Sequence, residues 1–134
     1  MRKASLVIVS FIAVLIAVSG FALKNGDVVF RGGDCSDESF RNGSTNGNTH
    51  SGPLTGISVY GRSGFTYQNV DQLRAANSDF RQRSGCWAKV KDITTLGGTI
   101  KFNKVNPGGP DHHVINGLTA AQLVNVFRDN HWED

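Results

Sequence analysis

The sequence predicts a small α+β domain that follows an N-terminal export signal, and three observations support this fold class. Short runs of β-branched and aromatic residues recur along the chain, each bounded by glycine, asparagine or proline. Two segments begin with polar capping residues and continue with apolar residues at helical spacing. The chain beyond the signal has the size of one domain with a modest core. We therefore expect a small mixed sheet of about five short strands with two main helices.

Residues 1–22 have the pattern of a secretory signal peptide. The segment starts with the basic pair Arg2 and Lys3, continues with an apolar run over residues 6–18, and ends in small residues of the kind a signal peptidase inspects. The apolar run is shorter than the ~20 residues that span a bilayer. This length favours cleavage over a membrane anchor. We expect a single secreted or periplasmic domain over residues 23–134, with no stable membrane anchor.

The chain contains two cysteines, Cys35 and Cys86. In an oxidising compartment, an isolated pair is more often a disulfide than two free thiols. Such a bond would close a loop of about fifty residues, and the chain-entropy model assigns closures of this length roughly 4 kcal/mol. For a small domain this is a large part of the total stability. We expect a Cys35–Cys86 disulfide.

Strands are predicted where β-branched and aromatic residues cluster or alternate with polar ones. Val28 and Phe30 belong to the first such run, which Gly32-Gly33 ends. A turn held by Pro107 and Pro110 precedes the last run. The predicted strands are residues 27–31, 55–60, 86–90, 99–103 and the short run that carries the adjacent pair His112 and His113.

Two helices carry capping signals, in which a polar cap is followed by glutamine three positions later. Asn69 caps the first helix, which is predicted over residues 70–76. Thr119 caps the second, which has the clearest apolar face and is expected to end near Asn130. These two segments are the main helices of the predicted fold.

Two further segments are predicted to be less regular. Residues 34–55 are polar and rich in turn-forming residues, which is typical of a long flexible loop. Asp92 is positioned to cap a single helical turn over residues 93–96, which Gly97-Gly98 would end.

The charge of the chain is unevenly placed. Between residues 62 and 104 there are eight basic and three acidic side chains, whereas the last residues of the chain are mainly acidic. A basic middle is compatible with a phosphate-bearing ligand, a nucleic acid or an acidic partner protein. It is equally compatible with a solvated surface that keeps the protein soluble.

The adjacent histidines suggest a metal site, but strand geometry argues against one. Neighbouring residues on a strand point to opposite faces, so His112 and His113 cannot both reach one ion. Asp111 and His113 share a face, yet a zinc site needs at least three protein ligands. We therefore expect no metal, and at most one of the two histidines to meet a given ligand.

The residues suggest two other chemistries. Asp34-Cys35-Ser36 resembles the Asp-Cys-Ser segment of secreted cell-wall peptidases, but the acidic residues that follow would raise the pKa of the thiol, and Cys86 is available as a disulfide partner. Two histidines and a lysine could also cleave RNA by acid-base catalysis. The residues available for that reaction are His50, His112, His113, His131, Lys101 and Lys104.

A family resemblance gives the most specific expectation. Val28-Val29-Phe30-Arg31-Gly32-Gly33 resembles the first strand motif of the bacterial ADP-ribosyltransferase toxins, and Thr55-Gly56-Ile57-Ser58-Val59-Tyr60 is similar to the second. His112-His113-Val114-Ile115 falls where the third motif is expected, and the proline-glycine turn and capped helix around it are similar to the ends of polymorphic toxin domains.

The resemblance implies a site for NAD. Arg31 would contact the NAD phosphates, Gly32 would allow close approach of the ligand, and Ser58 would line the nicotinamide pocket. The third motif of the family supplies a glutamate, but this chain has none between Glu38 and Glu133. The resemblance therefore leaves Asp111 or His113 to assist at the ribose.

The implied function is that of an exported toxin-like domain that transfers ADP-ribose from NAD to a protein target. One alternative is a non-enzymatic secreted binding or inhibitor protein whose basic middle meets an acidic partner protein. A ribonuclease-type toxin, which would bind nucleic acid, is the third possibility.

Overall fold

The computed structural model describes residues 22–47, 51–103, 109–127 and 131–133. Nearly all of the predicted signal peptide over residues 1–22 lies outside these ranges. So do His50, Lys104, Pro107 and the predicted end of the last helix. Among the described residues, no helix is both long enough and apolar enough to cross a membrane.

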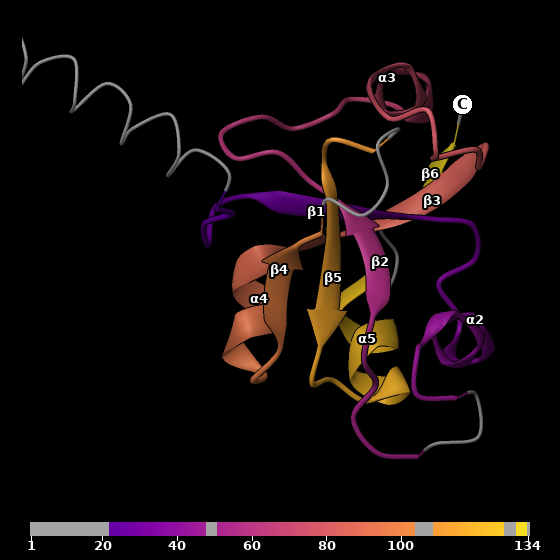
Figure 1. Cartoon of the computed structure of the whole chain (residues 1–134), viewed down its shortest axis with the longest axis vertical. Helices are drawn as coiled ribbons and strands as arrows, with labels where there is room; N and C mark the ends of the chain where they lie inside the picture. The colour runs from indigo at the N-terminus through magenta and orange to yellow at the C-terminus, as the bar shows by residue number, and fades with distance from the viewer. Residues whose placement is uncertain (1–21, 48–50, 104–108, 128–130, 134) are drawn as a thin grey trace, which may run out of the picture.

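The described chain forms a six-stranded sheet with four helices, which confirms the predicted α+β class (Figure 1). The strand order is β4-β5-β2-β1-β3-β6. All the described strand pairs are antiparallel, whereas a mixed sheet was predicted. In chain order the elements are β1 (Val28–Gly32), α2 (Asp37–Gly43), β2 (Ile57–Tyr60), α3 (Val70–Ala76), β3 (Ser84–Lys89), α4 (Val90–Thr95), β4 (Thr99–Phe102), β5 (His112–Asn116), α5 (Ala120–Phe127) and β6 (His131–Glu133).

The five predicted strands are confirmed as β1 to β5, with ends that differ from the predicted bounds by at most two residues, as is usual at strand ends. The sixth strand, β6, was not expected. It pairs with β3, with Ser84 opposite Glu133. Its three residues lack any alternating pattern of their own, so only pairing with β3 makes them a strand.

The two capped helices are confirmed. The helix α3 has the predicted bounds, and its cap Asn69 accepts a hydrogen bond of 2.8 Å from the Gln72 N–H. At the start of α5, the Gln122 N–H donates to the Thr119 hydroxyl and the Thr119 N–H donates to the Gln122 side chain, at 3.2 and 3.0 Å. This is the reciprocal capping box that the sequence predicted.

The prediction of one long loop over residues 34–55 was wrong, because α2 lies inside it. Ser36 caps this helix by accepting a hydrogen bond of 3.2 Å from the Ser39 N–H. Phe40 is its only fully buried side chain, so the segment has no apolar stripe that periodicity could detect. The helix α4 also differs, since it begins at Val90 and places Asp92 in its first turn and not at the cap.

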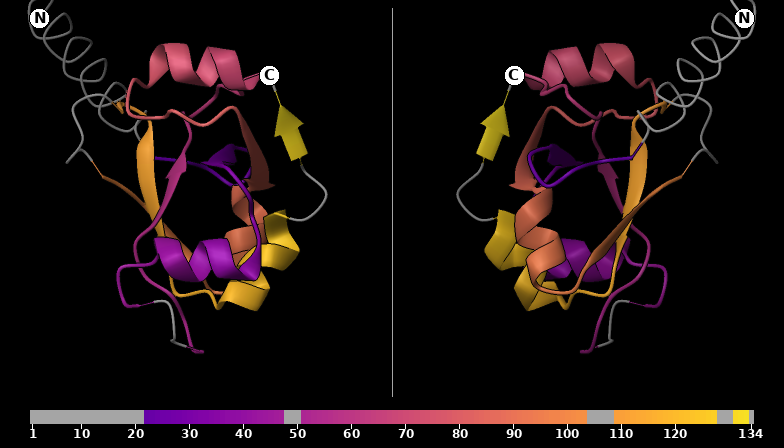
Figure 2. Two further views of the ribbon diagram at one scale, coloured as in Figure 1. Left: turned by 90° about the vertical axis from the view of Figure 1, so that its right-hand side faces the viewer. Right: turned by 90° about the vertical axis from the view of Figure 1, so that its left-hand side faces the viewer.

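The sheet has a hydrophobic cluster on each face. One cluster packs β1, β2, β3 and β5 against α2, α4 and α5, and contains Val29, Phe40, Val59, Ile115 and Phe127. The other lies on the opposite face under α3, and contains Phe30, Tyr60, Tyr67, Leu73 and Phe80. Figure 2 shows α3 on one side of the strands and α2 and α5 on the other. Alternate residues of β1, β2 and β3 therefore enter different clusters.

The predicted disulfide joins Cys35 to Cys86, with a Cα–Cα distance of 6.5 Å and a separation of 51 residues. Cys35 precedes the cap of α2, and Cys86 lies in β3 opposite Arg31 of β1. The bond therefore holds the start of α2 beside the centre of the sheet.

Replacing both cysteines by alanine should lower the free energy of unfolding by roughly 4 kcal/mol, because the unfolded chain regains the freedom of the closed loop. Urea unfolding of the oxidised protein and of the double variant measures this difference. Reduction of the parent protein should produce a similar loss. Equal unfolding midpoints for all three samples would contradict a structural role for the bond.

Candidate functional site

The three sequence motifs of the predicted NAD site lie on adjacent strands. The strand β2 lies between β1 and β5, with Phe30 opposite Tyr60 and with Ser58 opposite Val114. This order brings together Arg31, Ser58 and His112. The first two were predicted site residues, whereas the histidine is the neighbour of the one expected.

Arg31 contacts the backbone of Ser58 directly. Its Nη1 donates to the Ser58 carbonyl oxygen at 3.1 Å, and its Nη2 donates to the Ser39 carbonyl oxygen in α2 at 3.2 Å. The guanidinium carbon lies 5.0 Å from the centre of the Phe40 ring. A Cβ atom at Gly43 would lie 2.6 Å from Nη2, so α2 approaches the arginine closely only because that residue is glycine. Arg31 thus links β1, β2 and α2.

The charge of Arg31 is not balanced by an acidic residue of the described chain. Ion pairs between described residues are formed by Arg41, Arg62 and Arg74, and none of these pairs includes Arg31. Burial lowers the pKa of Arg31, and its Nε is a buried donor with no acceptor among the described residues. A largely buried cation that contacts only neutral carbonyl groups is unfavourable. An anion bound beside it would remove that cost.

Ser58 and His112 form a hydrogen-bonded pair. His112 Nε2 lies 3.0 Å from the Ser58 hydroxyl oxygen, and His112 Nδ1 lies 3.2 Å from the Asn103 carbonyl oxygen. A carbonyl oxygen can only accept, so Nδ1 carries the proton in the neutral ring. Nε2 is then free of a proton and accepts from the Ser58 hydroxyl. The Asn103 carbonyl therefore fixes the tautomer that makes His112 a base toward Ser58.

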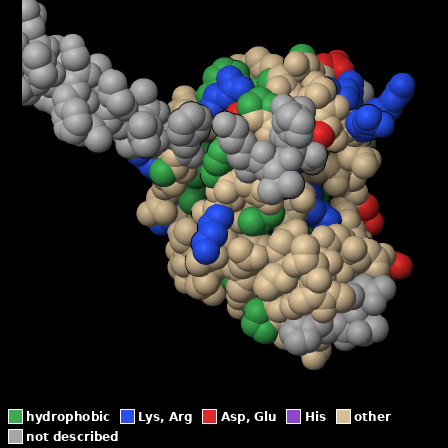
Figure 3. All heavy atoms as spheres, in the orientation of Figure 1, with side chains coloured by type: hydrophobic (Ala, Val, Ile, Leu, Met, Phe, Trp, Pro, Cys, Tyr) green, Lys and Arg blue, Asp and Glu red, His purple; other side chains and the backbone are tan. Residues whose placement is uncertain are grey.

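The face of the sheet that carries Ser58 is partly open to solvent. Ser58 and Val114 are half-buried, and Lys101 is exposed on the next strand. Lys101 is opposite Val114, which is opposite Ser58, so the three side chains share a face. Lysine and arginine side chains are spread over the face seen in Figure 3 and do not form one patch there.

His113 lies on the opposite face from His112, as strand alternation predicted. It is opposite Val59 and Phe102, and its ring centre lies 5.4 Å from that of Phe102. His113 Nδ1 lies 2.8 Å from the Asp111 carbonyl oxygen, and the side chain is 3% exposed. The predicted site residue is therefore packed against the core face, and the structure places its neighbour His112 at Ser58.

Asp111, the other residue expected to assist at the ribose, is the centre of a buried polar network. Its carboxylate accepts hydrogen bonds from Arg62 Nε at 2.9 Å, Arg62 Nη2 at 3.2 Å, Asn77 Nδ2 at 2.9 Å and the Tyr67 hydroxyl. The Asp111 N–H donates to Asn77 Oδ1 at 3.0 Å. All of these partners belong to the segment between β2 and β3. Asp111 thus anchors that segment to β5.

Gly32, which was predicted to allow close approach of a ligand, instead allows close approach of protein side chains. A Cβ atom at this position would lie 2.5 Å from Gln82 Cγ and 2.9 Å from Phe80 Cε2. The glycine therefore lets the segment after α3 pack against β1. The space in front of it is occupied by Gln82.

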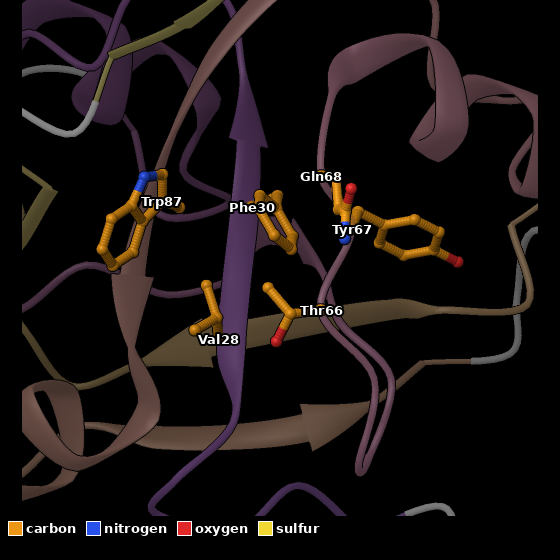
Figure 4. A pocket seen from close by; sticks show the side chains of 6 residues that line it. All are labelled: Val28, Phe30, Thr66, Tyr67, Gln68 and Trp87. Atoms are coloured by element: carbon orange, nitrogen blue, oxygen red, sulfur yellow. The ribbon is translucent and has the colours of Figure 1, made fainter.

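The structure also contains a pocket that was not expected from the sequence. It has a volume of about 230 Å³ and lies on the α3 side of the sheet (Figure 4). Figure 4 shows Trp87 and Thr66 on either side of β1, with the Tyr67 ring directed away from Trp87. The lining residues are Val28, Phe30, Thr66, Tyr67, Gln68 and Trp87. Their distance in sequence explains why no motif indicated the pocket.

No family model, curated protein or solved structure matches this chain. Among the described residues there is no group of three or more histidine, cysteine, aspartate or glutamate side chains that could hold a metal ion. The function is therefore inferred from the geometry of the site together with the sequence motifs.

Replacing Asp111 by asparagine should lower the free energy of unfolding by about 1–3 kcal/mol, because Tyr67 and Asn77 lose a charged acceptor in a buried place. Arg62 adds little, since its side chain is about half exposed. Chemical unfolding measures the loss. Asp34→Asn removes an exposed carboxylate and is the matched control. An unchanged midpoint for Asp111→Asn would show that the network does not hold the segment.

The stability of the protein should fall as the pH rises from about 10 to about 12. Burial, and then the hydrogen bond and the charge of Asp111, raise the pKa of Tyr67 from 10.0 to about 12. Burial and Asp79 raise the pKa of Tyr60 in the same direction. In this window the unfolded chain releases protons that the folded chain retains, so unfolding becomes more favourable. Urea midpoints measured across this range should decline less for Tyr67→Phe than for the parent protein.

Proposed function

We propose that this domain is an exported toxin-like module that transfers ADP-ribose from NAD to a protein target. The observation that carries the proposal is the largely buried guanidinium of Arg31, which has no acidic partner in the described chain and is hydrogen-bonded to the backbone of Ser58. The sequence motifs around these two residues resemble those of ADP-ribosyltransferase toxins.

Arg31 would supply the positive charge for the diphosphate of NAD. Guanidinium binds phosphate oxygens through charge-assisted hydrogen bonds, which are stronger than those between neutral groups. Two of its N–H groups donate to the carbonyls of Ser58 and Ser39, which orient the side chain. Its Nε–H is buried and has no acceptor among the described residues, and it is the donor that we assign to the bound phosphate.

His112 replaces Asp111 and His113 as the residue proposed to assist the reaction. Its Nε2 accepts a hydrogen bond from Ser58, whereas the Asp111 carboxylate is occupied by Arg62, Tyr67 and Asn77. A neutral imidazole can take a proton from the attacking group of the target. It lacks the negative charge with which a glutamate would steady the ribose, so we expect slow turnover.

A second candidate function is that of a non-enzymatic binding protein, and the pocket beside Trp87 favours it. The pocket is lined by apolar and aromatic side chains of β1 and β3 and by residues 66–68 of the segment before α3, which suits a small, mainly apolar group. It requires no chemistry at Arg31 or Ser58. The two candidates therefore differ in which variants abolish function.

The test is transfer of label from NAD. The purified protein should release nicotinamide and label a protein in a cell lysate, and Arg31→Lys should reduce both by about tenfold to a hundredfold because a charge-assisted hydrogen bond is lost. Arg81→Lys alters an exposed arginine of the same basic stretch and is the control. Thermal unfolding of each variant shows whether the fold is retained.

The outcomes separate the candidate functions. The absence of both NAD turnover and protein labelling would reject the transferase. Cleavage of added RNA, reduced in His112→Asn, would identify a ribonuclease. If neither substrate reacts, the binding protein becomes the favoured candidate, and substitution of Trp87 by alanine should then remove partner binding.

A further inference from the structure

We propose that Ser58 is a nucleophile activated by His112, and that the domain carries an esterase-type acyl-transfer activity that does not use NAD. The proposal concerns the hydroxyl of Ser58 and not the anion site at Arg31. It shares Ser58 and His112 with the proposed transferase but does not use NAD, so ester hydrolysis measured without NAD distinguishes the two activities.

The geometry has the three parts that an activated serine needs. The hydroxyl of Ser58 is 3.0 Å from His112 Nε2, and His112 Nδ1 is 3.2 Å from the Asn103 carbonyl oxygen. The first contact places a base on the nucleophile, and the second orients that base and fixes its tautomer. In serine hydrolases a carboxylate takes the orienting position. Here a neutral carbonyl holds the ring, so it provides orientation without extra charge.

The pair is held on rigid elements. Ser58 and His112 lie on neighbouring strands, two positions apart across the ladder, so their side chains share a face. The Tyr60 ring meets the His112 ring edge to face, with centres 5.4 Å apart, and the Tyr60 hydroxyl donates to Asp79 at 2.8 Å. Arg31 fixes the Ser58 backbone from its carbonyl side. Such support keeps a reactive pair in its working geometry.

A positive charge lies on the same face. Lys101 of β4 is exposed and is separated from Ser58 by Val114 alone in the row across the three strands. A lysine side chain is long enough to bring its ammonium group toward a substrate at Ser58. There it would stabilise the oxyanion that forms when the hydroxyl attacks a carbonyl carbon. The half-buried environment of Ser58 fits a small ester more closely than a folded protein.

The reaction balances with water as the only co-reactant. Ser58 Oγ attacks the ester carbonyl carbon while its proton passes to His112 Nε2, which gives a tetrahedral oxyanion. The bond to the leaving alkoxide breaks, and that oxygen takes the proton from His112. Water then attacks acyl-Ser58 with His112 again as the base, and a carboxylic acid and the free serine are released.

The experiment uses a fluorophosphonate probe and an aryl acetate on the purified chain. The probe should form one adduct at Ser58 with loss of fluoride, located by mass spectrometry of peptides, and Ser58→Ala should abolish it. His112→Asn keeps a donor for the Asn103 carbonyl but removes the base, so labelling and ester hydrolysis should slow by about a hundredfold or more. Ser84→Ala, at another strand serine, should react like the parent protein.

Several results would overturn the proposal. These are a folded parent protein that takes no label, a label that maps to a residue other than Ser58, or equal labelling rates in the parent and His112→Asn proteins. If His112→Asn does not fold, the mapped site on the parent protein and the Ser58→Ala result still decide the question. Lys101→Met should slow ester hydrolysis by about tenfold, and hydrolysis that proceeds in the absence of NAD separates this activity from the transferase.

Discussion

The packing of this domain depends on the hydrogen bonds that the carboxylate of Asp111 accepts. It collects donors from Arg62, Tyr67 and Asn77, and so holds the whole segment between β2 and β3 over one face of the sheet. That segment supplies α3 and most of the second hydrophobic cluster. Because Asp111 directly precedes β5, its anchoring also determines where that strand starts and which residues face Ser58. The Asp111 carboxylate, whose hydrogen-bonding positions are occupied, thus supports the site through the fold and is not itself a site residue.

Arg31 is the contrasting case. Asp111 has a cationic partner and a full set of donors, whereas Arg31 contacts two carbonyl oxygens and a phenyl ring and retains an unbalanced charge among the described residues. Its guanidinium lies where the disulfide holds α2 against the sheet, so the environment that buries the charge is itself fixed covalently. Burying an unbalanced cation lowers the stability of the fold, and such a cost is expected at a functional site.

The site joins two kinds of chemistry at one residue. The carbonyl of Ser58 accepts from Arg31 toward α2, and the hydroxyl of Ser58 donates to His112 on the opposite face. The anion site and the activated hydroxyl are therefore neighbours through the backbone of a single strand residue. Lys101 adds charge on the side of the hydroxyl, and α2 covers the side of the arginine.

The sequence by itself determined the α+β class, the N-caps of α3 and α5, the disulfide and the separation of His112 from His113, because propensity, caps and strand alternation are local properties. It did not reveal α2, whose one buried residue leaves no periodic pattern, or β6, which exists through pairing alone. Tertiary structure decided the site. The register between β2 and β5 places His112, and not His113, beside Ser58. The segment between β2 and β3 supplies the hydrogen-bond donors that surround the Asp111 carboxylate. Both outcomes depend on contacts between residues more than thirty positions apart in sequence.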